Sequence, residues 1–183
     1  MAEPTPGTIA ADVFDVIAAE ATRESPLWAA SLRPVGEREH VAVYSTLADP
    51  VFALGVETIY EGYLLHYGAP RLFAPADADT ALLLGDYLYA HGLVHIAATG
   101  SVDAVYDLAE LISLCAQARA ERGPGEAEAW AATAALIGRG GLVDARTALR
   151  ERGDPSLLDR VARQAVGDAA VERAVAAHVA RVG

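Results

Sequence analysis

Residues 77–99, DADTALLLGDYLYAHGLVHIAAT, decide the fold class of this 183-residue chain. The stretch predicts one long helix whose first turn is capped by Asp77, because the helix dipole favours a carboxylate there. At 100° per residue, Leu82, Leu88 and Val94 lie about 120° apart around the axis, so apolar side chains surround the helix. A helix without a polar stripe is buried at the centre of a bundle or lies at a subunit interface.

Glycine and proline mark the ends of further helices on both sides of this stretch. Asp49 followed by Pro50 starts a helix that ends before Gly68. The Gly100-Ser101 link is so short that the next helix, 102–122, is expected to return antiparallel as a hairpin. Other helices are predicted at 8–22, where Thr8 would cap the first turn, at 37–47 and at 126–137, with three shorter ones towards residue 183.

The length suits one domain with a sizeable core. We therefore predict an all-α fold, an antiparallel helical bundle that forms a single helical domain over residues 1–183. Its core is expected at 8–122, followed by short C-terminal helices at 123–183.

The charge balance excludes one class of partner. The chain has 14 basic residues, all arginine, against 25 acidic ones, for a formal net charge of −11. Nucleic-acid-binding proteins carry a basic stripe, and no arginine-rich run occurs here, so no nucleic-acid partner is expected.

Cysteine usage and the N-terminus indicate the compartment. Cys115 is the only cysteine, which excludes disulfides and cysteine-based zinc sites, and its apolar surroundings predict a buried, inert thiol. The first residues lack the basic and apolar regions of a signal peptide. Asp86, His91 and His95 interrupt the most apolar stretch and argue against a membrane span. We expect a cytoplasmic protein.

His91 and His95 lie one helical turn apart, which is the spacing of a metal-binding pair. A third ligand is needed, but Asp86 lies about 140° from His91 and 180° from His95 around the helix. His66 could contribute only from another helix. We therefore expect two hydrogen-bonded histidines, no metal and no cofactor. Asp86, on an apolar face, is expected to be paired or protonated.

Three segments resemble the trans-isoprenyl diphosphate synthases. Residues 82–90, LLLGDYLYA, resemble the family's LaGDyLla helix, and residues 56–66, VETIYEGYLLH, resemble the helix that precedes its first aspartate motif. Leu32-Arg33-Pro34 resembles the end of the family's GGKRLRP motif and ends 32 residues before His66, close to the family's interval. The resemblance covers residues 10–122 and implies a truncated isoprenoid-synthase fold.

The departures from the family fall on its chemistry. The family's two Asp-Asp-x-x-Asp motifs hold Mg²⁺ ions that neutralise the departing diphosphate. Tyr67-Gly68 stand where the first motif would begin, and no second motif follows. The family's Arg-Arg pair is reduced to Arg71, and residues 28–31, before Arg33, have lost their basic side chains. The remaining candidates for ligand binding are Arg33, Tyr63, His66, Arg71 and Asp86; none is expected to be catalytic.

The resemblance implies a non-catalytic relative that acts as a regulatory or partner subunit. It implies a homodimer, or a heteromer with a complete prenyl synthase, because the family's synthases dimerise through the region that matches the 77–122 hairpin. One alternative is a protein that binds an isoprenoid or another lipid in the residual apolar pocket, where Tyr63 would exclude a long chain. Another alternative is an enzyme of a different class.

Overall fold

Helices account for about three quarters of the chain. The computed structural model describes residues 6–182, and these form nine α-helices and no strand, so the predicted all-α fold is confirmed. The helices are α1 (Pro6–Glu24), α2 (Pro26–Ser31), α3 (Ala53–Tyr67), α4 (Ala78–Ala98), α5 (Val102–Glu121), α6 (Glu126–Leu136), α7 (Val143–Arg152), α8 (Ser156–Val166) and α9 (Asp168–Val182). Short 3₁₀ turns at Val35–Glu37, Ser45–Leu47 and Pro50–Phe52 connect α2 to α3.

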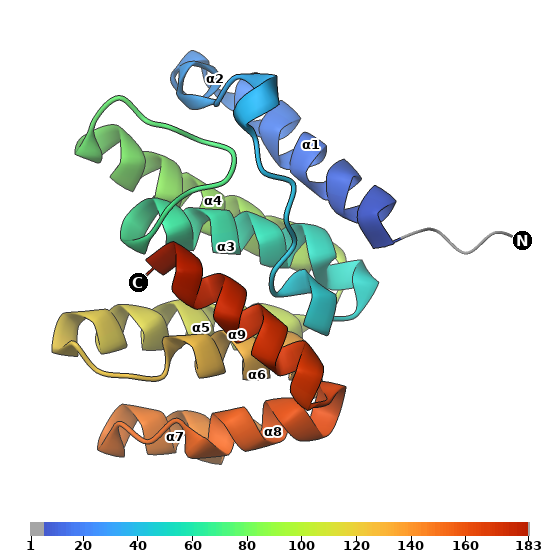
Figure 1. Ribbon diagram of the computed structural model, residues 1–183, viewed down its shortest axis with the longest axis vertical. Helices are drawn as coiled ribbons and strands as arrows, with labels where there is room; N and C mark the ends of the chain where they lie inside the picture. The colour runs from blue at the N-terminus through green and yellow to red at the C-terminus, as the bar shows by residue number, and fades with distance from the viewer. Residues whose placement is uncertain (1–5, 183) are drawn as a thin grey trace, which may run out of the picture.

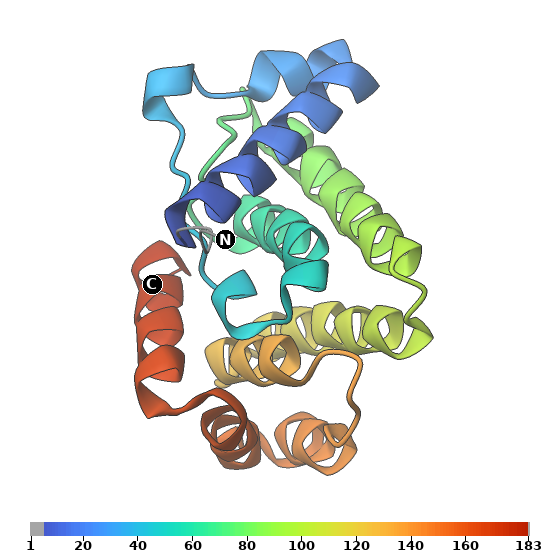
Figure 2. The ribbon, with the colours of Figure 1, turned by 90° about the vertical axis from the view of Figure 1, so that its right-hand side faces the viewer.

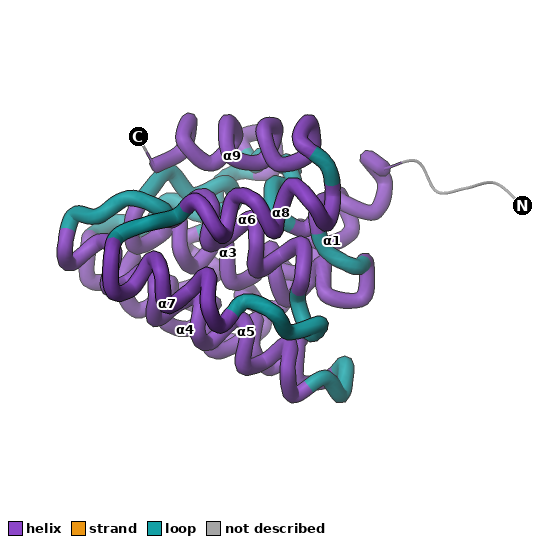
Figure 3. The backbone as a smooth tube through the Cα atoms, turned by 90° about the horizontal axis from the view of Figure 1, so that it is seen from below, coloured by secondary structure: helices purple, strands orange, loops and turns teal. Residues whose placement is uncertain are grey.

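The helices are stacked in layers (Figure 1). The α3–α4 pair lies in the middle, α5 and α6 lie below it, α7 and α8 form the lowest layer, and α1 crosses above. α9 crosses the front of this stack and contacts α3 and α6. α5 runs back in the opposite direction to α4 but diverges from it beyond the link (Figure 2). Viewed from below, α9 lies on one side of the molecule and α4 and α5 lie on the other (Figure 3).

The contact between α3 and α4 depends on glycines. Gly55 and Gly62 on α3 face Gly85 and Gly92 on α4, so that the two backbones approach closely. A Cβ added at Gly62 would lie 2.9 Å from the carbonyl oxygen of Gly85, and one at Gly55 would lie 3.0 Å from that of Gly92. Any larger residue at these positions would force the helices apart.

The helix predicted at 37–47 is wrong. Between its flanking 3₁₀ turns the chain is extended, because the carboxylate of Glu57 takes the hydrogen bonds that a helix would otherwise use. Its Oε1 accepts from the backbone N–H groups of Val43 and Ser45 at 3.1 and 3.0 Å. A buried side chain on α3 therefore determines the conformation of a segment that precedes it in the chain.

Helix starts follow the expected chemistry at most sites. Asp49 caps the turn that leads into α3 by accepting from the N–H of Val51 at 3.1 Å. Ser25 caps α2, a helix absent from the predicted set, in the same way, because Ser25-Pro26 is the same cap-and-proline signal as Asp49-Pro50. The described part of α1 begins at Pro6, so Thr8 lies inside the helix and is not its cap.

Aromatic rings fill the centre of the bundle between α3, α6 and α9. Tyr44, Tyr60, Tyr63 and Trp130 are at most 1% exposed and pack against one another with ring centroids 5.0–6.0 Å apart. His178 on α9 completes the cluster, and its Nδ1 lies 3.2 Å from the hydroxyl of Tyr60. Each ring pair contributes about 0.5–1.5 kcal/mol beyond the area it buries. Tyr63 therefore lies within a packed cluster of rings.

Candidate functional site

α4 is only partly covered by the rest of the chain. Its inner side packs against α3 and α5, and Leu84 and Leu88 there are fully buried. Its outer side carries Leu82, Leu83 and Val94, which are 53–62% exposed. At 100° per residue these three lie within about 120° of one another and form an apolar stripe, which the exposed side chain of Asp86 interrupts between Leu82 and Leu83. The C-terminal helices pack against α3, α5 and α6 and leave this stripe uncovered.

α5 carries a row of exposed side chains of its own. The exposed side chains of α5 at positions 102, 106, 109, 113 and 116 are all uncharged and recur at helical spacing. Val102 and Tyr106 are 80% and 56% exposed. We call this surface the α4–α5 face and define it by Leu83, Ala90, Val94, Val102, Tyr106 and Ala109.

α4 also passes a test for membrane-spanning helices. Among the described residues it is the one helix long and apolar enough to cross a bilayer, judged by length and composition alone. One such helix is weak evidence, because a core helix passes the same test. The side chains of Asp86, His91 and His95 interrupt it, and its inner side packs on α3, so the chain has no clear membrane span.

Arg71 lies at the centre of a buried ion cluster. Its side chain is fully buried, its Nε donates to Glu61 Oε2 at 2.9 Å, and its Nη1 donates to the carboxylate of Glu57 and to the carbonyl of Val41. Burial opposes its charge, but the two carboxylates outweigh this effect and raise the pKa of Arg71. The second oxygen of Glu61 accepts from the N–H of Leu72 at 2.7 Å. The guanidinium thus joins α3 to two loop segments.

His66 and Asp86, two other candidates, lie together. His66 Nε2 at the end of α3 is 3.2 Å from Asp86 Oδ1 on α4, so the two side chains lie within ion-pair distance of each other. Burial lowers the pKa of His66, although the nearby Asp86 carboxylate opposes that shift. Asp86 is 64% exposed, so the pair lies at the edge of the α4–α5 face.

Tyr63 belongs to a separate group of side chains. Its hydroxyl accepts a hydrogen bond from Arg119 Nη2 at 3.0 Å. Arg119 also lines a surface hollow of about 340 Å³, together with Glu126 and His178. The charged groups in this wall favour a polar occupant over an isoprenoid chain.

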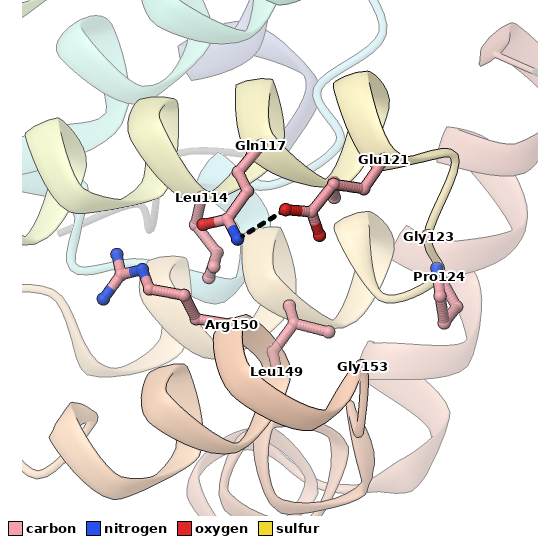
Figure 4. Close-up of a pocket in the computed structure, with 9 residues that line it drawn as sticks. Leu114, Gln117, Glu121, Gly123, Pro124, Leu149, Arg150 and Gly153 are labelled. Atoms are coloured by element: carbon pink, nitrogen blue, oxygen red, sulfur yellow. Dashed lines mark hydrogen bonds between the residues drawn. The ribbon is translucent and has the colours of Figure 1, made fainter.

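Arg33 and a small cavity between α5 and α7 are two further candidates for a ligand site. The backbone N–H of Arg33 donates to the carbonyl of Leu72 at 2.9 Å, while its side-chain Nε is buried without a partner. A cavity of about 30 Å³ lies between α5 and α7, lined by Leu114, Gln117 and Leu149 among others (Figure 4). This volume holds about two water molecules. The five candidate residues therefore do not converge on one site.

The structure supplies the third ligand that the sequence did not reveal. Glu20 on α1 places Oε2 2.9 Å from His91 Nε2 and 2.8 Å from His95 Nε2. Burial opposes ionisation of Glu20, but the hydrogen bonds and charges of both histidines outweigh it and lower the pKa of the carboxyl. The two histidines are therefore hydrogen-bonded, as expected, but the expectation that no third potential ligand faces them is wrong, because one comes from α1.

Comparisons with protein-family models, with curated proteins and with solved structures found no match. Among the described residues, the α4–α5 face and the cluster of Glu20, His91 and His95 are two features that could bind a partner or a metal ion. The first is an apolar surface without cover, and the second is a set of metal-type ligands.

Proposed function

We propose that the protein is a non-catalytic assembly subunit that forms a homodimer through the α4–α5 face. The observation that carries this proposal is the composition of that face. It presents large exposed apolar side chains on two adjacent helices, in a chain whose formal net charge is −11. Exposed apolar surface of this kind marks protein interaction sites.

A second copy of the chain is the partner that best matches the face. A two-fold interface places the same surface on both subunits, so the surface must complement itself. Here small residues such as Ala90 and Ala109 alternate with large ones such as Val94 and Tyr106, which lets two helix faces interlock. The stripe also lacks basic side chains, so it offers no charge that would attract an acidic partner.

We infer that the protein is non-catalytic because two of its arginines bind other side chains of the same chain. Arg71 is committed to Glu57 and Glu61, and Arg119 is committed to Tyr63 and Glu126. These contacts stabilise the fold and occupy two of the arginines that could otherwise hold a diphosphate. The resemblance to trans-isoprenyl diphosphate synthases fits the proposal, since it suggests a relative without aspartate motifs, and a heteromer with a complete synthase is the main alternative assembly.

Light scattering coupled to size exclusion tests the proposal. We expect a mass of about 38 kDa, twice the chain mass of 19.1 kDa, at micromolar concentration. The L83E and V94E variants should elute at the monomer mass, because each places a charge where about 1.5–3 kcal/mol of apolar burial is expected. The V143E variant is the matched control, since Val143 is 66% exposed but lies on α7.

Three results would count against the homodimer. A wild-type monomer at micromolar concentration would exclude it and direct attention to a complete prenyl synthase as the partner. A dimer that V143E disrupts, but L83E and V94E do not, would place the interface elsewhere. Sedimentation of the wild-type monomer with lipid vesicles would show that the α4–α5 face binds a membrane surface instead.

A further inference from the structure

Two helices distant in sequence bring together three residues that commonly ligate metals. Glu20 lies on α1, and His91 and His95 lie one turn apart on α4. One ligand atom from each residue lies within 4.8 Å of the other two. The side chains are 17–26% exposed, so the cluster is sheltered but open to entry from solvent.

The geometry requires only a small change to admit a metal ion. Both Nε2 atoms now share a single oxygen of Glu20, at 2.9 and 2.8 Å. In a tetrahedral zinc site, bond lengths near 2.0–2.1 Å place neighbouring ligand atoms about 3.3 Å apart. The two Oε2–Nε2 distances therefore need to lengthen by about 0.5 Å, and the two Nε2 atoms, which lie within 4.8 Å of each other, need to reach a similar separation. Arg23, the nearest cation, lies 3.8 Å from the other oxygen of Glu20 and is 74% exposed, so it can move away.

The surroundings of the cluster support a ligand site independently. The ring of Tyr87 stacks on His91, with centroids 5.2 Å apart and planes at 16°. Trp28 stacks on Tyr87 in turn, at 5.8 Å, and so helps to fix the orientation of the histidine ring. The hydroxyl of Tyr87 is buried without a hydrogen-bond partner. The stack of Trp28, Tyr87 and His91 therefore restrains the His91 ring, as the groups around a metal site restrain its ligands.

We propose that Glu20, His91 and His95 bind one Zn²⁺ ion through Oε2 and the two Nε2 atoms. Two imidazoles and one carboxylate suit zinc, and a site with three protein ligands keeps a fourth position for water. The ion joins α1 to α4 across 71 residues of chain, counted from Glu20 to His91. Its binding therefore also stabilises the position of α1 on the bundle.

Calorimetric titration with ZnCl₂ tests this proposal on protein made without a histidine tag and stripped with EDTA. We expect one zinc per chain. H95A should lower the affinity by more than about 100-fold, because even loss of the groups that orient ligands costs 10–100-fold. E20Q keeps a side chain that can hydrogen-bond to both histidines, so it should fold normally and still bind zinc more weakly.

The control is H40A, which removes another partly exposed histidine, 3.9 Å from Asp15 on α1, outside the cluster. It should bind zinc like the wild type. Co²⁺ provides a second readout, since a tetrahedral site gives an intense visible absorption that H95A should abolish. The proposal fails if the wild type binds no zinc, if H95A and E20Q bind it as tightly as the wild type, or if H40A weakens binding as much as H95A.

Discussion

Replacing Arg71 with methionine would leave two carboxylates buried without their cation. Glu57 and Glu61 are fully buried, and both pair with the Arg71 guanidinium. Removing one partner of a buried ion pair costs about 3–5 kcal/mol. The upper part of this range applies, because one arginine serves two carboxylates and also donates to the carbonyl of Val41. For a chain of this length, a loss of about 4–5 kcal/mol lowers the melting temperature by about 8–20 °C.

Thermal unfolding followed by circular dichroism at neutral pH measures the effect. Arg71→Lys should lose less than Arg71→Met, because lysine keeps the charge but lacks the planar fork that reaches both glutamates. Arg150→Met is the matched control: its pair with Glu110 is partly exposed and contributes about 0–1 kcal/mol. An Arg71→Met protein that melts within about 2 °C of the wild type would refute the structural role of Arg71 and restore it as a candidate for ligand binding.

Three further predictions follow from the packing, the buried histidine and the missing aspartate motifs. Gly62→Ala should destabilise the fold by about 1–3 kcal/mol in urea denaturation, since its Cβ would lie 2.9 Å from the carbonyl oxygen of Gly85; an unchanged midpoint would refute the close approach of α3 and α4. Burial, with a smaller effect of the Arg119 charge, lowers the pKa of His178 to about 4. The neutral His178 therefore contributes about 3 kcal/mol to the free energy of unfolding above pH 6.5, and this contribution is lost as the pH falls towards 4. His178→Phe should weaken this pH dependence, and denaturation of both proteins at pH 7.5 and 4.5 checks it, with equal pH dependence as the contrary result. The protein should show no Mg²⁺-dependent elongation of short isoprenoid diphosphates, and formation of a longer prenyl diphosphate in a product assay would contradict the proposed role.

The sequence predicts the long helices well because their ends carry local signals. Asp77 accepts a hydrogen bond from the N–H of Thr80 at 2.7 Å, and Ser101 caps α5 in the same way. The apolar circumference of 77–99 predicted a helix without a polar side. In the structure, α4 is buried on one side and presents an apolar stripe on the other. Burial of Cys115 is likewise confirmed, and burial raises the pKa of its thiol.

The remaining features depend on contacts between distant segments. The extended chain at 38–44 follows from the side chain of Glu57, which no local pattern in that segment reveals. Glu20 joins His91 only because α1 crosses α4, so a helical wheel of α4 alone could not find it. The close contact between the glycines of α3 and α4 could have been predicted from the sequence. Gly55 and Gly62 are seven residues apart, as are Gly85 and Gly92, and this repeat places small residues on one face of each helix.

The central claim is that the chain forms a homodimer through the α4–α5 face. Cross-linking of variants that each carry one added cysteine tests this claim most directly. Ala90 lies in the middle of the α4 stripe and is exposed, whereas the native Cys115 is buried and has a raised pKa, so it should not react. With a flexible bifunctional maleimide, Ala90→Cys should give a covalent dimer of about 38 kDa, twice the 19.1 kDa chain, and Val143→Cys on α7 should stay monomeric. Equal cross-linking of both variants, or cross-linking of Val143→Cys alone, would contradict the account.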